Sequence, residues 1–186
     1  MSSEIRISKG FLEGKSIKIL KGKRYRPTME QGRISLFNSL REKISNSYFL
    51  DLFAGSGIVG LEALSLGARR VVFVENHLPA VKILRVNVKN LGVEEKVEVF
   101  LSDVFSFLNN SPKEKFDIIF MDPPYSLGEK VNNVLELIEK NSWLKEDGIL
   151  IVEHHKKTKI IQELKNLKLF QIKNFGETLF SYYKLR

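Results

Sequence analysis

Short apolar segments alternate with amphipathic ones from about residue 48 onward, and this alternation constrains the fold more than any other feature of the sequence. Helical patterns near residues 58–66, 77–91, 103–109, 129–141 and 157–166 separate the apolar runs. The apolar runs themselves end at Asp51, Glu75, Leu101, Asp122 and Glu153. Nearly continuous apolar strands that alternate with helices predict an α/β fold, in which helices cover both faces of a mostly parallel, twisted sheet.

The carboxyl-terminal part of the chain departs from this alternation. Residues 168–174 and 178–184 both have the pattern of strands, and only residues 175–177 connect them. A connection this short cannot cross a sheet, so it forces the two strands to be antiparallel. We therefore expect the last strand to run antiparallel in an otherwise mostly parallel sheet.

The amino-terminal part adds a separate feature. Residues 4–8 and 16–20 alternate polar and apolar side chains on either side of a glycine-containing turn, which predicts a β-hairpin. A helix is expected after Pro27-Thr28, with an apolar face formed by Ile34, Phe37, Leu40 and Ile44. We expect a hairpin extension over residues 1–29 and a main domain over residues 30–186.

The positive charge of the chain is concentrated in this hairpin. The 186 residues carry a net charge of +8, of which residues 1–29 contribute +6. A basic segment on a nearly neutral body favours a polyanionic partner, with nucleic acid ahead of a membrane surface, although a solvated face has the same composition. The chain has no cysteine, which excludes disulfides and cysteine nucleophiles, and no apolar run of membrane-spanning length. We expect a soluble cytoplasmic protein.

A glycine-rich turn follows the first strand of the α/β part. Gly55, Gly57 and Gly60 form a G-x-G-x-x-G pattern between a predicted strand and a predicted helix, and Glu75 lies 20 residues after Gly55. This arrangement is typical of a dinucleotide site, in which the acidic residue binds a ribose. Taken alone, the turn suits a nicotinamide or flavin cofactor as well as any other nucleoside.

Acidic residues stand where the predicted strands end. Asp51, Glu75 and Asp122 close three strands, and Asp103 lies two residues past another. In an open α/β sheet the ligand binds outside the carboxyl ends of the strands. Four acids around one crevice predict a site for a ligand with hydroxyl, amino or cationic groups.

The segment Asp122-Pro123-Pro124-Tyr125 distinguishes between these cofactors. Its two prolines fix φ and remove two backbone donors, so the chain leaves the sheet as a stiff edge rich in acceptors. A carboxylate, the Pro123 carbonyl and an aromatic ring then lie together beside the crevice. This set suits a planar base that carries an amino group.

The glycine turn, Glu75 and the Asp122-Pro-Pro-Tyr125 segment together resemble S-adenosylmethionine-dependent methyltransferases that act on exocyclic amino groups of bases. The combination of Arg26-Pro27-Thr28, Arg33 and Leu36-Phe37-Asn38 resembles the bacterial 16S rRNA (guanine-N2)-methyltransferases of the RsmD type. The resemblance covers essentially the whole chain. It implies a Rossmann-like class I methyltransferase fold with the basic hairpin as an extension, and transfer of a methyl group to the exocyclic N2 of a guanine in 16S rRNA.

The resemblance also assigns roles to residues. Base binding and catalysis fall to Asp122, Pro123, Pro124 and Tyr125. Asp51 would attract the α-ammonium group of S-adenosylmethionine, Glu75 its ribose hydroxyls and Asp103 its adenine amino group. The full set expected around this cofactor is Asp51, Phe53, Ala54, Gly55, Ser56, Gly57, Glu75, Asn76, Asp103 and Val104.

RNA contacts are expected from the basic hairpin and from the start of the helix that follows it. The residues concerned are Lys15, Lys18, Lys21, Lys23, Arg24, Arg26, Thr28 and Arg33. The expected partner is 16S rRNA or an assembling small ribosomal subunit, bound by a monomer. His154 and His155, next to Lys156 and Lys157, are expected in a solvated loop or an RNA-contacting rim, and no metal site is predicted because a ligand set is missing.

Three other functions remain open at this point. A DNA amino-methyltransferase acting on adenine N6 or cytosine N4 can carry the same D-P-P-Y chemistry, although about 45 residues before the first core strand leave little room for target recognition. A dehydrogenase would need a substrate domain for which this chain has no place. A nucleic-acid-binding module with an idle cofactor fold is the alternative from a different class.

Overall fold

The computed structural model describes residues 2–20 and 30–186. The strands in these residues are β1 (Ser2–Arg6), β2 (Ser16–Leu20), β3 (Tyr48–Leu52), β4 (Arg70–Glu75), β5 (Val97–Leu101), β6 (Phe116–Met121), β7 (Leu144–His155), β8 (Leu167–Phe175) and β9 (Thr178–Leu185). The helices are α1 (Glu30–Ser39), α2 (Ile58–Ser65), α3 (Leu78–Leu91), α4 (Val104–Leu108) and α5 (Val131–Lys140), with 3₁₀ turns η1 (Glu94–Lys96) and η2 (Tyr125–Lys130).

Seven strands form one mixed sheet in the order β5-β4-β3-β6-β7-β9-β8. The first five of these are mutually parallel, while β9 pairs antiparallel with both β7 and β8. The predicted parallel sheet with an antiparallel last strand is therefore confirmed. After β5 the chain returns to the other side of β3, so the strand order reverses between β3 and β6. Ligands of open α/β sheets bind at such a switch point.

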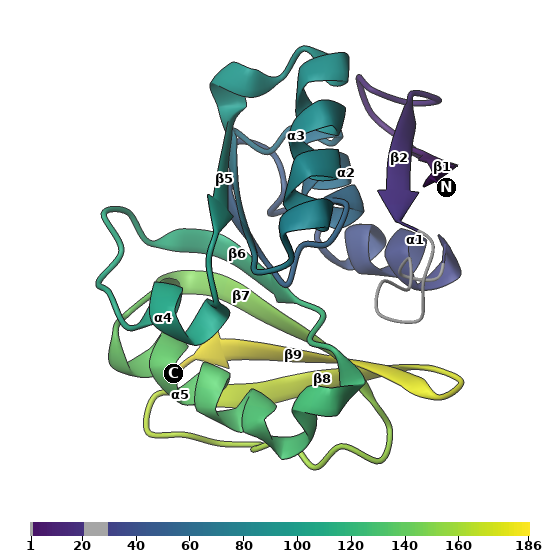
Figure 1. The fold of residues 1–186 in the computed structure, drawn as a ribbon. Coiled ribbons are helices and arrows are strands. Elements are labelled where there is room, and N and C mark those ends of the chain that lie inside the picture. Colours follow the sequence, from purple (N-terminus) through teal and green to yellow (C-terminus); the bar gives the residue numbers. More distant parts are fainter. Residues whose placement is uncertain (1, 21–29) are drawn as a thin grey trace.

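Helices lie on both sides of the sheet, as Figure 1 shows, and a hydrophobic layer packs on each face. Alternate residues of one strand point to opposite faces. Phe49 and Ile118 pack with α1, α2, α3 and the hairpin, whereas the next residues, Leu50 and Ile119, pack with α4 and α5. Strands buried on both faces explain the nearly continuous apolar runs in the sequence.

The predicted hairpin is confirmed, and it is packed onto the main domain. β1 and β2 pair antiparallel, with Ile5 opposite Ile17. Ile7, Leu12 and Ile17 are at most 5% exposed and belong to the same hydrophobic layer as α2 and α3. The turn of the hairpin lies against α2, because Phe11 N donates to Ser65 O at 3.0 Å. The hairpin is thus held by the core as well as by its own hydrogen bonds.

The prediction of a helix over residues 157–166 is wrong, because this segment is extended. His155 at the end of β7 and Phe175 at the end of β8 both pair with Thr178 of β9. The segment that connects β7 to β8 must therefore run back along the whole length of β8. Eight strand steps span roughly 27 Å, whereas eleven helical residues reach only about 16 Å. Side chains satisfy the backbone of the extended segment at Ile161. The Asn132 side chain accepts the Ile161 N–H, and the Tyr183 hydroxyl donates to the Ile161 C=O.

The helix before the sheet also differs from its prediction. α1 ends at Ser39, and turns carry the chain through Leu40 and Ile44, which are buried as expected. Ile34, expected on the buried face, is 36% exposed, while Arg33 is 1% exposed. The helix is rotated in this way because Arg33 forms an internal ion pair with Glu62 of α2, with Nε 2.5 Å from Oε2.

None of the helices in residues 2–20 and 30–186 has the length and apolar character needed to cross a membrane.

Candidate active site at the carboxyl ends of the strands

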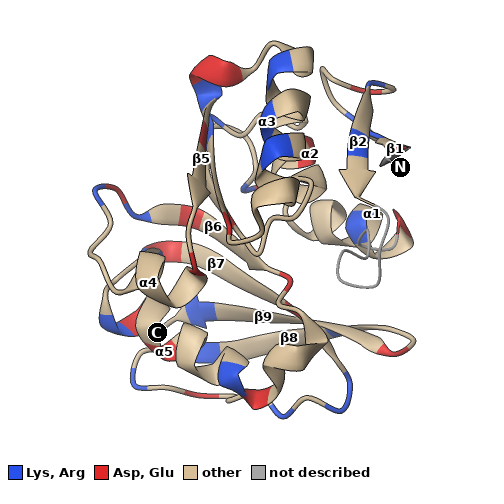
Figure 2. Cartoon of the chain, in the orientation of Figure 1, with Lys and Arg blue, Asp and Glu red and all other residues tan. Residues whose placement is uncertain are grey.

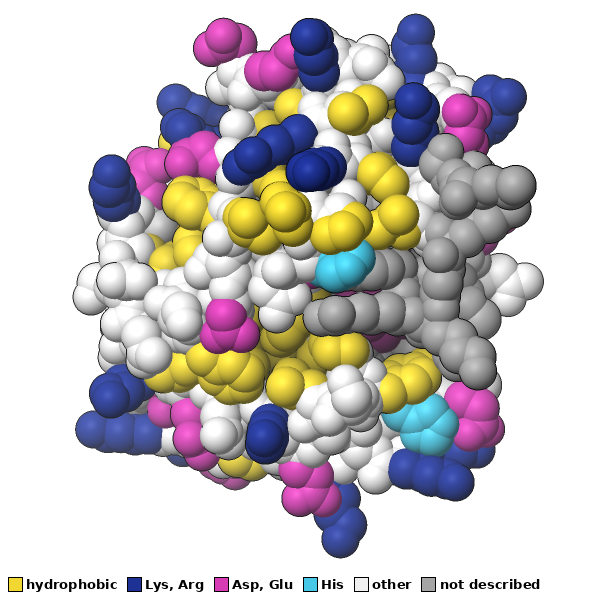
Figure 3. All heavy atoms as spheres, viewed as in Figure 1, with side chains coloured by type: hydrophobic (Ala, Val, Ile, Leu, Met, Phe, Trp, Pro, Cys, Tyr) yellow, Lys and Arg dark blue, Asp and Glu magenta, His cyan; other side chains and the backbone are white. Residues whose placement is uncertain are grey.

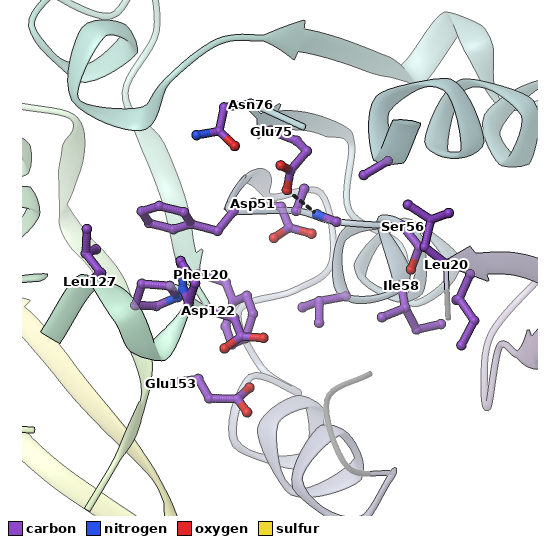
Figure 4. A pocket seen from close by; sticks show the side chains of 18 of the residues that line it. Leu20, Asp51, Ser56, Ile58, Glu75, Asn76, Phe120, Asp122, Leu127 and Glu153 are labelled. Carbon is purple, nitrogen blue, oxygen red and sulfur yellow. Dashed lines mark hydrogen bonds between the residues drawn. The ribbon is translucent and has the colours of Figure 1, made fainter. Parts of the chain in front are cut away.

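A cavity of about 500 Å³ opens at the carboxyl ends of the central strands, next to the switch point between β3 and β6. Its size is in the range of small-molecule and cofactor sites. The loops after β3, β4, β5 and β6 all contribute to its wall, together with β2, α3 and the end of β7. Figure 4 shows the carboxylates of Asp51, Asp122 and Glu153 pointing toward this one hollow.

The glycine turn forms one side of the cavity. Phe53, Gly55 and Gly57 adopt left-handed φ values of 61°, 56° and 81°. Such a φ is uncommon for a residue with a side chain, and strained residues of this kind cluster at functional sites. A Cβ atom on Gly57 would stand 2.3 Å from Leu84 Cδ1, so a larger residue there would force the Leu84 side chain to move and would also strain the left-handed backbone.

The acidic residues at the strand ends hold the loops that follow them. Asp51 Oδ2 accepts the Gly60 N–H at 2.9 Å, in the first turn of α2. Glu75 accepts the N–H groups of Gly55 and His77 at 2.9 and 2.7 Å, so it ties the glycine turn to the start of α3. Asp103 Oδ1 caps α4 through the Ser106 N–H at 3.1 Å. Each carboxylate therefore anchors backbone donors at the cavity wall, as helix-capping side chains do.

Burial changes the protonation of two of these acids. Loss of solvation raises the pKa of Asp51 from 3.8 to about 8, although the Gly60 hydrogen bond opposes this shift. Nearby Asp122 and Glu75 add to it by charge repulsion. Loss of solvation likewise raises the pKa of Asp122 to about 7. Both carboxyls therefore keep their proton to a higher pH than a free aspartate, and a cationic group beside them would favour their charged form.

The Asp122-Pro123-Pro124-Tyr125 segment leaves β6 at the cavity wall. All four residues line the cavity, Pro123 is buried, and Tyr125 is 46% exposed with its ring edge-on to His155 at a centroid distance of 5.5 Å. β6 and β7 pair with Met121 opposite Val152, which places Asp122 beside Glu153 at the next position. Two acceptor side chains and an exposed aromatic ring therefore share this side of the cavity.

Most of the residues predicted around the cofactor come together in the cavity wall. Those that line it are Asp51, Phe53, Ala54, Gly55, Ser56, Glu75, Asn76 and Asp103. Gly57 lies just behind the wall, and Val104 does not line it because its side chain is 2% exposed and packs in the layer of α4 and α5.

Several residues of the wall are not among those expected from the sequence. They are Ile19, Leu20, Ile58, Val59, Ala80, Ile83, Phe105, Phe120, Ser126, Leu127 and Glu153. Glu153 carried a usable signal, since it closes an apolar run in the sequence just as Asp51, Glu75 and Asp122 do. The apolar members carried none, because in the sequence they resemble core residues.

Residues 5–184 match the model of a protein family described as "Conserved hypothetical protein 95". The ribosomal RNA small subunit methyltransferase D of Buchnera aphidicola (strain APS) is 36% identical over 172 residues, which cover 92% of this chain and 88% of that protein. The Escherichia coli K12 protein of the same name is 31% identical, over 98% of this chain and 91% of its own length. The chain belongs to the ribosomal RNA small subunit methyltransferase D family. The solved structure of yhhF from Escherichia coli matches with a TM-score of 0.89 and 29% identity, covering 99% of each chain.

Membership of the methyltransferase D family confirms the resemblance stated from the sequence, and the structure corrects one of its expected RNA contacts. Arg33 lies in the interior of this family member, where it pairs with Glu62, which also accepts hydrogen bonds from Ser8. A buried, paired guanidinium is not available to RNA at the surface. Lys15 and Lys18 are exposed. The expected contacts at Lys21, Lys23, Arg24, Arg26 and Thr28 lie outside the described residues.

The expectation for the two histidines is also corrected in part. β7 continues through His155, so these residues belong to the sheet and not to a loop. His154 is 4% exposed and bonds to Ser181 Oγ at 2.9 Å, and its burial lowers its pKa. His155 lies 3.4 Å from Glu177 and packs against Tyr125. Within the described residues of this methyltransferase D relative, no group of three or more His, Asp or Glu side chains could hold a metal.

Proposed function

We propose that this protein is an S-adenosylmethionine-dependent methyltransferase that transfers a methyl group to the exocyclic N2 of a guanine in 16S rRNA. It would act in the cytoplasm, on the rRNA or on an assembling small subunit. One observation carries the proposal: the Asp122-Pro123-Pro124-Tyr125 edge and the glycine turn face each other across a single cavity. The relatives named for small-subunit rRNA methylation, which match nearly the whole chain, support the choice of RNA over DNA.

The cavity suits S-adenosylmethionine in size and in the distribution of its polar groups. Its volume of about 500 Å³ accommodates a nucleoside with an amino-acid tail. Asp51 would face the α-ammonium group and Glu75 the ribose, with Asp103 and Asn76 at the adenine. The glycine turn lies at the start of α2, and the N-terminus of a helix favours a carboxylate such as that of the methionine part. The cofactor supplies a methyl group that its sulfonium already activates.

The remaining work of catalysis is positioning, because the amino nitrogen of a base is a poor nucleophile whose lone pair is delocalised into the ring. The Asp122 carboxylate and the Pro123 carbonyl would accept the two amino hydrogens and direct the nitrogen lone pair toward the methyl group. The same oxygens would stabilise the positive charge that develops on this nitrogen. Tyr125 would stack on the base after it leaves its RNA stack.

The position of Glu153 gives a physical reason why guanine would be preferred over adenine and cytosine as the substrate base. In guanine the ring nitrogen next to the amino group carries a hydrogen, whereas in adenine and cytosine the corresponding nitrogen is an acceptor. Asp122 directly follows β6, Glu153 is the next residue of β7 after the Met121–Val152 pair, and both line the cavity. A second carboxylate beside Asp122 would accept the N1–H of guanine and repel the ring nitrogen of the other two bases.

Glu153→Gln is expected to reduce the preference for guanine. A glutamine amide can donate to an acceptor nitrogen, so it tolerates 2-aminopurine, which keeps the amino group but has an acceptor at N1. Wild-type protein should methylate an rRNA fragment with guanine at the target position at least about tenfold faster than one with 2-aminopurine, and the variant should narrow this ratio. An unchanged ratio in the variant would remove Glu153 from base selection.

Glu75→Ala is expected to weaken S-adenosylmethionine binding by roughly 10- to 100-fold, because it removes a ribose acceptor and the anchor of Gly55 and His77. Transfer at saturating cofactor should change much less. Titration calorimetry measures the affinity, with Glu98→Ala as the matched control, since Glu98 lies on neighbouring β5, forms an ion pair with exposed Arg70 and does not line the cavity. Equal affinities for the wild type and the Glu75 variant would exclude Glu75 from the ribose site.

The deciding experiment is methylation of bare 16S rRNA and of small subunits from a strain that lacks this gene. Mass spectrometry of the nucleosides should find N2-methylguanosine. Methylated adenine or cytosine in DNA would instead identify a DNA amino-methyltransferase. Cofactor binding without transfer to any nucleic acid would identify a binding module with an idle cofactor fold.

A further inference from the structure

The outward face of α3 is basic and carries no acid. Lys82, Arg85, Val86 and Lys89 are spaced by three, one and three residues, so they share one side of the helix, and all four are exposed. The opposite side, with Val81, Leu84 and Val88, is buried. The sequence of α3 contains neither Asp nor Glu. A helix face with three cations and no anions attracts a polyanion.

The hairpin places a further exposed cation, Lys18, next to α3. Asn87 of α3 accepts the Lys18 N–H at 2.8 Å and donates to the Lys18 carbonyl at 2.9 Å, so β2 lies directly along the helix. The Asn87 side chain also donates to Ser56 O in the glycine turn at 3.1 Å. Lys18 itself is exposed. Figure 2 shows basic residues on both α3 and β2 in the same part of the molecule.

Exposed apolar side chains stand among these cations. Leu78 and Val86 of α3 are 46% and 42% exposed, and Phe11 in the turn of the hairpin is 59% exposed beneath the Lys96 ammonium, 5.5 Å from its ring centroid. Figure 3 shows basic and hydrophobic side chains together in the upper half of the molecule. Surfaces that bind single-stranded nucleic acid combine cations for phosphates with apolar or aromatic groups for bases.

The same two elements reach the cavity. Ile19 and Leu20 of β2 and Ala80 and Ile83 of α3 line its wall. The cavity itself contains several carboxylates, which repel phosphate, so phosphate contacts have to lie outside it. Glu94 and Glu95 follow the carboxyl end of α3, whereas the cavity-lining Ala80 and Ile83 lie nearer its amino end.

We propose that Lys18 together with Lys82, Arg85 and Lys89 forms a track for the RNA backbone that leads a single-stranded segment to the cavity. The inference rests on the proposed function, since it takes RNA as the substrate. It extends the expected recognition surface from the hairpin and the start of the following helix to a face that the hairpin and α3 form together. In this arrangement the phosphates bind along the helix and a base next to them enters the cavity.

The test is a triple variant, Lys82→Ala, Arg85→Ala and Lys89→Ala, whose binding to in vitro transcribed 16S rRNA is measured at several salt concentrations. Loss of three phosphate contacts should flatten the log–log salt dependence by about two units and lower the affinity at 0.15 M salt by roughly tenfold or more. Affinity for S-adenosylmethionine should stay unchanged, because none of the three side chains lines the cavity.

The matched control is Lys113→Ala, Lys115→Ala and Lys140→Ala, which removes the same charge from exposed positions outside the cavity wall and outside α3 and the hairpin. It should retain most of the wild-type affinity and salt dependence. If the two triple variants lose the same affinity for 16S rRNA, the proposed track is overturned, because the loss then depends only on the net charge of the protein. Binding is measured without methyl transfer, so failure of wild-type protein to methylate rRNA would count against the proposed function and leave this test intact.

Discussion

Replacing Asp122 with alanine is expected to slow methyl transfer by roughly 30- to 150-fold at saturating cofactor and RNA. The variant loses a charge-assisted hydrogen bond to the amino group, a loss of about 2–3 kcal/mol of transition-state stabilisation. Single-turnover transfer of labelled methyl groups at pH 8 measures the effect, since at this pH the carboxyl with a pKa of about 7 is ionised. Cofactor affinity should stay within several-fold of wild type.

Two controls separate this role from a structural one. Asp122→Asn retains the shape and one acceptor oxygen but no charge, so its rate should fall between those of the wild type and the alanine variant. Thermal unfolding of the cofactor-free variants reports whether the fold is intact. Turnover of the alanine variant above about a tenth of wild type would contradict the catalytic assignment, because so small a loss corresponds to less than about 1.4 kcal/mol.

The cofactor-free protein is expected to lose stability as the pH rises from about 4 to 8. Burial raises the pKa of Asp51 to about 8, so the folded chain keeps a proton that the unfolded chain releases above about pH 4. Unfolding then releases this proton, and the free energy of unfolding falls by up to about 1.4 kcal/mol per pH unit for this carboxyl. Denaturant titrations of the wild type and Asp51→Asn at pH 5 and pH 8 measure the difference.

The asparagine variant should be more stable than wild type at pH 8 and close to it at pH 5. Its amide oxygen can still accept the Gly60 N–H, so the start of α2 keeps its partner. Equal pH dependence of the two proteins would show that Asp51 is ionised in the folded chain across this range. The expected binding of the cofactor ammonium would then not require a shift in protonation.

The hairpin, the order of alternating strands and helices and the antiparallel end of the sheet could be predicted because each depends on local patterning. Residue period and connection length determine which segments become strands and how neighbouring strands run. The failed prediction over residues 157–166 shows the limit of this reasoning. Its apolar spacing suits a helix, but the distance back along β8 requires an extended chain, and the insertion of β9 between β7 and β8 is a property of the whole sheet.

The site divides in the same way. Asp51, Glu75, Asp122 and the glycine turn were predictable because they occupy strand ends, and strand ends meet at one edge of a parallel sheet. Arg33 was not, since its sequence context resembles that of a surface cation, and only the approach of α1 to α2 brings it to Glu62. The basic face of α3 was not predicted for a similar reason. The sequence does not show that the hairpin packs against α3 through Asn87, and so it does not show which cations of the hairpin and of α3 lie near each other.

The sequence by itself determined the fold class and the positions of the glycine turn and the Asp122-Pro-Pro-Tyr125 segment at strand ends, since short-range spacing encodes all three. Tertiary structure alone decided which acids also anchor backbone, which cation is buried, and that Glu153 stands beside Asp122. The physical reason is that burial and charge depend on neighbours distant in the chain. The pKa of a carboxyl group in water differs from its pKa in a buried site, and only the packed structure determines how far the group is buried.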